Sequence, residues 1–161
     1  MYIFSIEPRS AALKVGQSFQ ADIWLNGTES LGYAQIELTF AHHLTFQQFN
    51  FSQSAFKSPL GEVANNGMLL IQRGIPPGTS PISGRLLFGS IIFSVVDVGQ
   101  SRLSFTVNCQ ALQFPSATDV FDHGVDGFFA IRQAGPATRL DLDDGIDALA
   151  VSVDALDAVI P

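Results

Sequence analysis

Apolar and polar residues alternate along most of the chain with a period of two, which is the pattern of half-buried β-strands. The segment LGYAQIELTF, residues 31–40, shows it most clearly. One of its faces carries Ala34, Ile36, Leu38 and Phe40, and the other carries Tyr33, Gln35, Glu37 and Thr39. We expect the first face to lie in a hydrophobic core and the second to meet either water or a partner.

Similar runs recur at short intervals, separated by turn residues such as Asn26-Gly27 and the Pro- and Gly-rich loop at residues 75–84. The runs cover residues 2–8, 11–15, 18–27, 44–52, 67–74, 85–99, 101–114 and 125–133. Some eight to ten short strands with regularly spaced turns, and no convincing helix, predict an all-β fold of the β-sandwich class.

The composition changes near residue 136, which predicts a domain boundary there. Residues 136–161 lose the Phe and Gln content of the preceding chain and gain Ala, Val and Asp. Apolar residues within them recur at helical spacing, namely Leu149, Val153, Leu156 and Ile160. We therefore expect a β-sandwich at 1–135 and an acidic linker or tail at 136–161, with a short C-terminal helix as a candidate element.

Composition and charge exclude several classes of function. The chain of 161 residues is 47% hydrophobic, which is ample for a core, and its net charge is −7. Residues 1–138 carry 9 acids and 7 bases, and the last 23 carry 6 Asp and one Arg. Neither part has the basic face that nucleic-acid binding requires. No apolar run reaches the ~18–20 residues of a membrane span, and no nucleophile–base–acid arrangement suggests an enzyme.

Four segments in order resemble the cohesin family of bacterial surface modules. They are LKVGQSFQADIWLNG, LGYAQIELTF, SGRLLFGSIIFSVVDVGQSRLSF and DGFFAI, and together the resemblance spans roughly residues 3 to 132. Ala41 stands where the family usually has Asp after the aromatic residue, which indicates a divergent or non-cellulosomal member.

The resemblance implies a non-catalytic jelly-roll sandwich of about nine strands without a cofactor. Its relatives bind dockerin modules, which are small calcium-loaded helical domains, across the outer face of one sheet. The start of the chain directly on a strand pattern, without a signal peptide, favours a module of a longer secreted bacterial protein, located outside the cell or on its surface.

Five residues are candidates for partner binding. The resemblance places Tyr33 and Gln35 at outward positions that contact the partner, and Glu37 follows on the same face. In the long run after residue 84, alternation with Ile91 and Phe93 inward puts Phe88 and Ser90 outward, where large apolar side chains suggest a covered surface.

Two alternatives remain, a carbohydrate-binding module and a structural spacer domain. Trp24, the single tryptophan, falls on the polar phase of its strand, so it is either a carbohydrate-stacking residue or partly buried under a loop. Sugar-binding faces usually align two or three aromatic rings, and the sequence shows no clear companions for Trp24 on its strand face.

The sequence predicts no metal site. His42 and His43 are adjacent on an extended chain and point in different directions, which makes them a poor chelating pair. Asp119, Asp122 and Asp126 fit turn chemistry better than a calcium site. The single cysteine, Cys109, is expected to be a small buried residue.

Overall fold

The computed structural model describes residues 1–135, which form eleven β-strands and contain no helix. The strands are β1 (Tyr2–Glu7), β2 (Ser10–Lys14), β3 (Ser18–Thr39), β4 (Leu44–Asn50), β5 (Ser58–Asn65), β6 (Met68–Gly74), β7 (Ile82–Val95), β8 (Gly99–Phe105), β9 (Gln110–Gln113), β10 (Phe121–Val125) and β11 (Gly127–Arg132). The prediction of an all-β sandwich is confirmed. None of the elements described is a helix long and apolar enough to cross a membrane.

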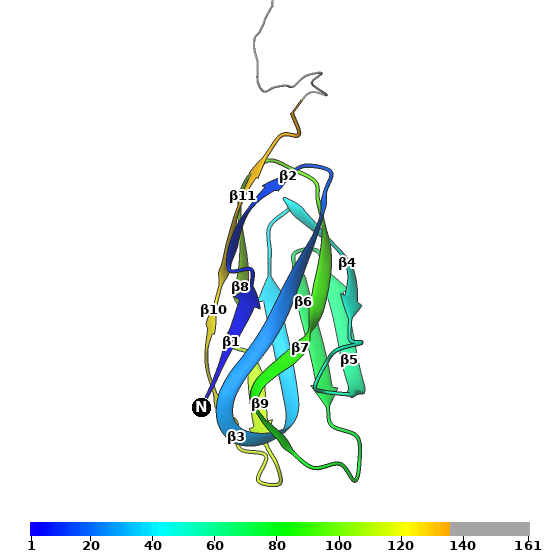
Figure 1. The fold of residues 1–161 in the computed structure, drawn as a ribbon, viewed down its shortest axis with the longest axis vertical. Helices are drawn as coiled ribbons and strands as arrows, with labels where there is room; N and C mark the ends of the chain where they lie inside the picture. Colours follow the sequence, from blue (N-terminus) through cyan, green and yellow to red (C-terminus); the bar gives the residue numbers. More distant parts are fainter. Residues whose placement is uncertain (136–161) are drawn as a thin grey trace, which may run out of the picture.

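Strand β3 belongs to both layers of the sandwich. It runs down one side of the molecule, bends at its lower end and returns in the other layer (Figure 1). The register with β7 is lost between Gly27 and Leu31, which marks this corner. At Gly27 an added Cβ would lie 2.6 Å from the Tyr2 ring, so only glycine lets the chain turn so close to β1.

The first half of β3 pairs with β7 on one side and with β1 on the other. β4 joins the outer side of β7, and β10 joins β1 in parallel, which gives the first sheet the order β4-β7-β3-β1-β10. The second half of β3 pairs with β6 and β9, and β5 pairs with β6. The second sheet therefore has the order β5-β6-β3-β9, and the end of β8 adds to β3 at Leu38 and Thr39.

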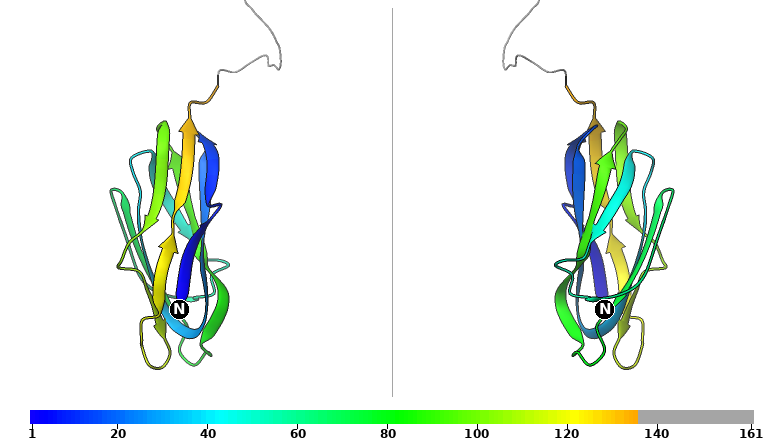
Figure 2. Two further views of the ribbon diagram at one scale, coloured as in Figure 1. Left: turned by 90° about the vertical axis from the view of Figure 1, so that its left-hand side faces the viewer. Right: turned by 90° about the vertical axis from the view of Figure 1, so that its right-hand side faces the viewer.

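The remaining pairs lie at the upper end of the molecule. β11 pairs antiparallel with β8 and parallel with β2. From the side that carries β1, β2, β10 and β11, these strands run along the long axis of the molecule (Figure 2). Eleven strands replace the expected nine because β5 and β10 lie outside the predicted runs and the run 101–114 forms both β8 and β9, whereas β3 joins two predicted runs into one strand.

The core fills the space between the two sheets. It consists of side chains that are almost wholly buried, among them Phe4, Ile23, Leu25, Ile36, Leu38, Ile71, Phe88 and Phe93. On residues 33–38 the buried positions are those of the predicted apolar face, Ala34, Ile36 and Leu38. The boundary at residue 136 and the candidate C-terminal helix lie outside the described residues.

The predicted outward orientation of Phe88 is wrong. Ile23 pairs with Gly89 and Trp24 pairs with Leu87, so Phe88 is an extra residue in β7 at a β-bulge. The bulge reverses the inward and outward phase of β7, because strict alternation holds only for an uninterrupted ladder. Phe88 is 0% exposed and packs near Phe49 and Phe56, while Ile91 and Phe93 face inward as expected.

Candidate protein-binding face

The outer surface of the second sheet brings together the predicted residues of β3 with residues from its neighbours. We call this surface the outer face. Register pairs Gln35 with Gln72 of β6 and with Gln110 of β9, and pairs Tyr33 with Leu112. The side chains directed to it from β3, β6 and β9 are those of Tyr33, Gln35, Glu37, Thr39, Met68, Leu70, Gln72, Gln110 and Leu112.

Hydrogen bonds hold the polar groups at the centre of the outer face in fixed positions. The Tyr33 hydroxyl donates to Gln35 Oε1 over 2.9 Å, and Gln72 Nε2 donates to the same oxygen over 2.8 Å. Gln35 Nε2 in turn donates to the Asn108 carbonyl oxygen over 2.7 Å. Partial burial raises the pKa of Tyr33, so its phenol stays protonated. The amide groups are thus oriented before any partner arrives.

Glu37 is held by the turn between β8 and β9. Its Oε1 accepts hydrogen bonds from Thr106 Oγ1 and, over 2.9 Å, from Asn108 Nδ2. Beneath it lies the thiol of Cys109, 3.4 Å from the Glu37 backbone nitrogen. Cys109 is 1% exposed, and burial raises the pKa of its thiol to about 11. Cys109 is therefore a protonated packing residue, as the sequence predicted.

Glu37 is the one carboxylate or cationic side chain that β5, β6, β9 and residues 31–39 of β3 direct outward. The other charged residues of these segments are Glu62 and Arg73. Register pairs Glu62 with buried Ile71, and Arg73 is itself only 5% exposed, so both lie on the inner side. The outer face is consequently almost neutral, with one carboxylate near its centre.

Apolar side chains surround this polar centre. Leu60 and Val63 of β5 are 58% and 46% exposed, and Phe114, directly after β9, is 55% exposed. None of the three is among the residues predicted from the sequence. The alternation of residues 110–114, with Ala111 inward, is the signal in the sequence that places Leu112 and Phe114 on the outer face.

Solved structures with this architecture are cohesin modules. The seventh ScaB type I cohesin from Pseudobacteroides cellulosolvens has a TM-score of 0.68 at 15% identity, and the match covers 88% of this chain and 98% of that one. A non-cellulosomal cohesin from the archaeon Archaeoglobus fulgidus has a TM-score of 0.66 at 13% identity, covering 81% and 91%. The fold is that of the cohesins.

A third similar structure is the third ScaB cohesin of R. flavefaciens, described in complex with a group 1 dockerin. Its TM-score is 0.63 at 13% identity, and the match covers 84% of this chain and 96% of that one. No protein-family model matches the sequence, and no protein with a curated description matches it. Identities of this size establish the cohesin fold, and the partner has to be argued from the face itself.

Phe88 and Ser90 do not join the outer face of this cohesin fold. Both lie on β7, in the first sheet, with Phe88 in the core. Ser90 is 8% exposed and points to the outside of the first sheet, where its hydroxyl donates to Asp22 Oδ1 over 2.7 Å. Of the five predicted partner-binding residues, the structure thus brings together Tyr33, Gln35 and Glu37.

Trp24 also lies on the outer side of the first sheet, and one face of its ring is covered. The guanidinium carbon of Arg85 is 3.7 Å from the ring centroid, and Arg85 Nη2 is 2.8 Å from Glu7 Oε2. A sugar stacking on that side would have to displace the guanidinium. The surroundings of Trp24 therefore fit the alternative of partial burial, except that an arginine side chain covers the ring instead of a loop.

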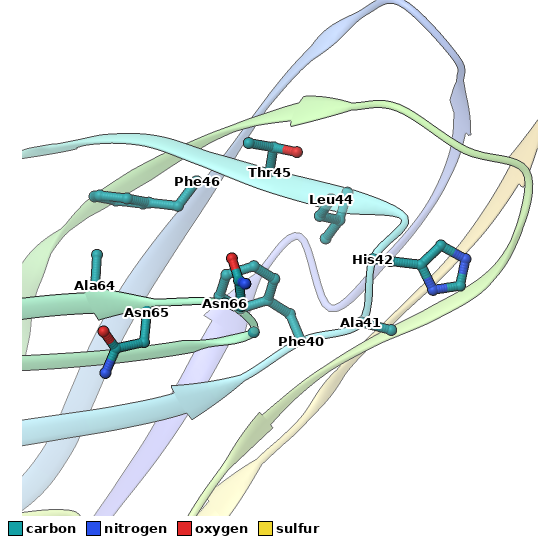
Figure 3. Close-up of a pocket in the computed structure, with 10 residues that line it drawn as sticks. Phe40, Ala41, His42, Leu44, Thr45, Phe46, Ala64, Asn65 and Asn66 are labelled. Carbon is teal, nitrogen blue, oxygen red and sulfur yellow. The ribbon is translucent and has the colours of Figure 1, made fainter.

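A groove of ≈ 880 Å³ lies between β4 and the turn that joins β5 to β6. Its apolar lining comes from Phe40, Leu44, Phe46 and Ala64, and its polar lining from Thr45, Asn65, Asn66 and His42. Phe40 lies between the two elements in Figure 3. The groove opens between the edges of the two sheets, away from the outer face.

The histidine pair and the aspartates form no metal site in the described residues. His42 and His43 stack with ring centroids 4.2 Å apart, and His42 Nε2 is 3.2 Å from Asp97 Oδ2. Asp119 Oδ1 accepts from the backbone nitrogens of Ala111 and Phe121, over 3.1 Å each. The Asp119 carboxylate therefore stabilises the connection between β9 and β10, as expected for an aspartate in a turn.

Proposed function

We propose that this chain is a non-catalytic module that attaches a partner protein noncovalently through the outer face. The observation that carries the proposal is the pre-formed network of Tyr33, Gln35, Gln72 and Asn108, set among exposed aliphatic and aromatic side chains. Interfaces combine apolar contact area with oriented hydrogen-bonding groups in this way.

The outer face is large enough for a specific complex. The four strands lie ~4.8 Å apart, and three of them are about eight residues long whereas β9 has four, so the face spans roughly 19 by 26 Å at its longest. Side chains that project from the outer face add to its accessible surface, which brings that surface near the ~800 Å² per partner of a standard interface. The partner is a dockerin-type domain, calcium-loaded and helical, and the context is a secreted or surface-attached scaffold protein. The dockerin complex of the R. flavefaciens cohesin supports this choice of partner.

Calorimetry with the full chain and a panel of calcium-loaded dockerin modules tests the proposal. Gln35→Ala removes the central acceptor and donor of the network, so we expect binding to weaken about tenfold, or ~1.4 kcal/mol. Gln20→Ala is the matched control, because Gln20 is an exposed glutamine on the outside of the first sheet. A calcium chelator should abolish binding to the wild type.

Equal affinities of the Gln35→Ala variant and the wild type would contradict the assignment of this face. Retention on cellulose or xylan in affinity gels, with no dockerin bound, would instead favour a carbohydrate-binding module. A chain that binds neither would fit the spacer alternative.

A further inference from the structure

The groove between β4 and the β5–β6 turn, which we call the edge groove, lies at an open edge of the sandwich. Among the described strands, β4 pairs only with β7 and β5 pairs only with β6. Register places Ala64 of β5 opposite buried Leu69, so its side chain points to the inner side of the sheet, and yet Ala64 is exposed. Within residues 1–135, the two sheets therefore leave inward-facing positions uncovered at this edge.

The floor of the edge groove is continuous with the hydrophobic core. Leu44 is 3% exposed, and the half-buried rings of Phe40 and Phe46 pack against the core. The Phe40 ring centroid lies 5.2 Å from that of fully buried Phe93. The lining contains no carboxylate, lysine or arginine, and its one titratable side chain is His42. An aliphatic occupant would extend the core, whereas a charged one would lose its hydration without gaining a counter-charge.

The chain reaches residue 135 at the same end of the molecule as the edge groove (Figure 1). Three backbone hydrogen bonds lead from the last strand to the groove, namely Val15 N to Arg132 O, Gly16 N to Val95 O and Val96 N to His43 O. Three such steps of ~4.8 Å, with the short shifts along the chain between them, put Arg132 roughly 15–20 Å from His43. His43 directly follows His42, which lines the groove.

The residues after 135 carry an apolar pattern that fits such a surface. At ~100° per residue, Leu149, Val153, Leu156 and Ile160 of a helix fall within a sector of about 60°. Val151 falls on the opposite side, about 200° from Leu149. Isolated helices shorter than ~12–15 residues are marginal in water, so a helix in this segment needs an apolar surface to pack on.

Reach and charge both favour the edge groove as that surface. From residue 135 to Leu149 there are fourteen residues, which can span ~45 Å at ~3.3 Å each and so easily cover the gap. Residues 141–144, on the way, include three aspartates. Lys14 and Arg132 are register partners and both are exposed at this end of the fold, so the aspartates have counter-charges near their path.

We propose that residues 146–161 of this chain dock as a helix in the edge groove, with Leu149 near Leu44 and Ile160 near Phe49. The apolar side of the helix then covers the open edge of the sandwich. A helix rises ~17 Å from residue 149 to residue 160. The five residues from Leu44 to half-buried Phe49 also span ~17 Å of strand. The edge groove lies away from the outer face, so this inference is independent of the proposed function.

Methyl NMR on the full, isotope-labelled chain tests the docking directly. We expect nuclear Overhauser effects between the methyl groups of Leu44 or Ala64 and those of Leu149 or Val153. Val153→Asp should abolish these effects and shift the side-chain amide signals of Asn65 and Asn66, which line the groove. Val151→Asp is the matched control, because it makes the same change on the opposite side of the helix, and it should leave the signals unchanged.

A substitution in the groove tests the other half of the contact. Ala64→Glu places a carboxylate at an exposed position of the lining, so it should break the contact between Leu44 and Leu149 without disturbing the fold. Ala130→Glu is the matched control, because Ala130 is an exposed alanine of β11. Contacts that persist in Ala64→Glu would overturn the placement in the edge groove.

The remaining outcomes identify other occupants. If the wild type shows no contact between the groove methyls and residues 146–161, the proposal fails. If Val151→Asp and Val153→Asp have equal effects, the segment does not dock as a helix, since residues two apart share a face only in an extended chain. If the contacts arise only between differently labelled copies in a mixed sample, the groove holds the segment of a second molecule and the intramolecular docking is wrong.

Discussion

Replacing Phe88 by alanine tests the bulge in β7, because the bulge alone puts this side chain in the core. Phe88 is 0% exposed, with its ring centroid 5.8 Å from that of Phe49 and 5.7 Å from that of Phe56. Truncating a buried phenylalanine removes its transfer free energy and leaves a cavity, at a cost of about 3–5 kcal/mol. Phe114→Ala removes the same atoms at a site 55% exposed and should cost less than ~1 kcal/mol.

Equilibrium unfolding in urea, followed by Trp24 fluorescence, measures the difference. With a slope near ~2 kcal/mol per molar, the Phe88→Ala midpoint should fall by roughly 1.5–2.5 M and the Phe114→Ala midpoint by less than ~0.5 M. If Phe88→Ala lost less than ~1 kcal/mol, the side chain would be outside the core. The register of β7 against β3 derived above would then be wrong.

Two further predictions concern buried polar groups. Burial raises the pKa of Cys109 to about 11 from an ordinary value near 9, so its contribution to the free energy of unfolding is complete below pH 9 and lost as the pH rises through 11. The difference in unfolding free energy between wild type and Cys109→Ala should shrink by on the order of 2–3 kcal/mol between pH 8 and pH 11, and a constant difference would contradict this. Arg73 Nε donates to the Phe56 carbonyl oxygen over 2.7 Å, and the guanidinium carbon lies 3.7 Å from the Phe51 ring centroid. Because Arg73→Ala removes both contacts, we expect it to lower the free energy of unfolding by about 2–4 kcal/mol. Arg73→Met keeps most of the volume and should cost clearly less in the same urea titration; equal losses would mean that the cavity is not the main cause.

Most strands could be predicted because alternation is a local property. Residues 18–25 and 33–39 have the predicted faces, because the extra residue of the bulge lies in β7 and β3 itself alternates without a break over each of these two stretches. The failure at Phe88 has a non-local cause. A bulge depends on the register between two strands far apart in sequence, and neither Leu86 nor Phe88 differs in kind from the residues that point outward elsewhere.

The candidate site was predicted in part for the same reason. Tyr33, Gln35 and Glu37 lie on one strand, so their common face follows from spacing. Leu60 and Phe114 come from separate segments, and their positions beside Gly74 and Gly32 depend on the pairing of β3 with β6 and β9. Sequence spacing carries no information about such cross-strand neighbours.

The parallel pairing of the terminal strands has a mechanical consequence. β1 and β2 pair in parallel with β10 and β11, along the long axis of the molecule (Figures 1 and 2). A force that pulls residue 1 and residue 135 apart therefore acts along these strands, and loads the hydrogen bonds of each ladder together. Antiparallel terminal strands would instead open one bond at a time. The topology thus gives the folded domain resistance to tension applied between residues 1 and 135, because the hydrogen bonds of each parallel ladder have to break together.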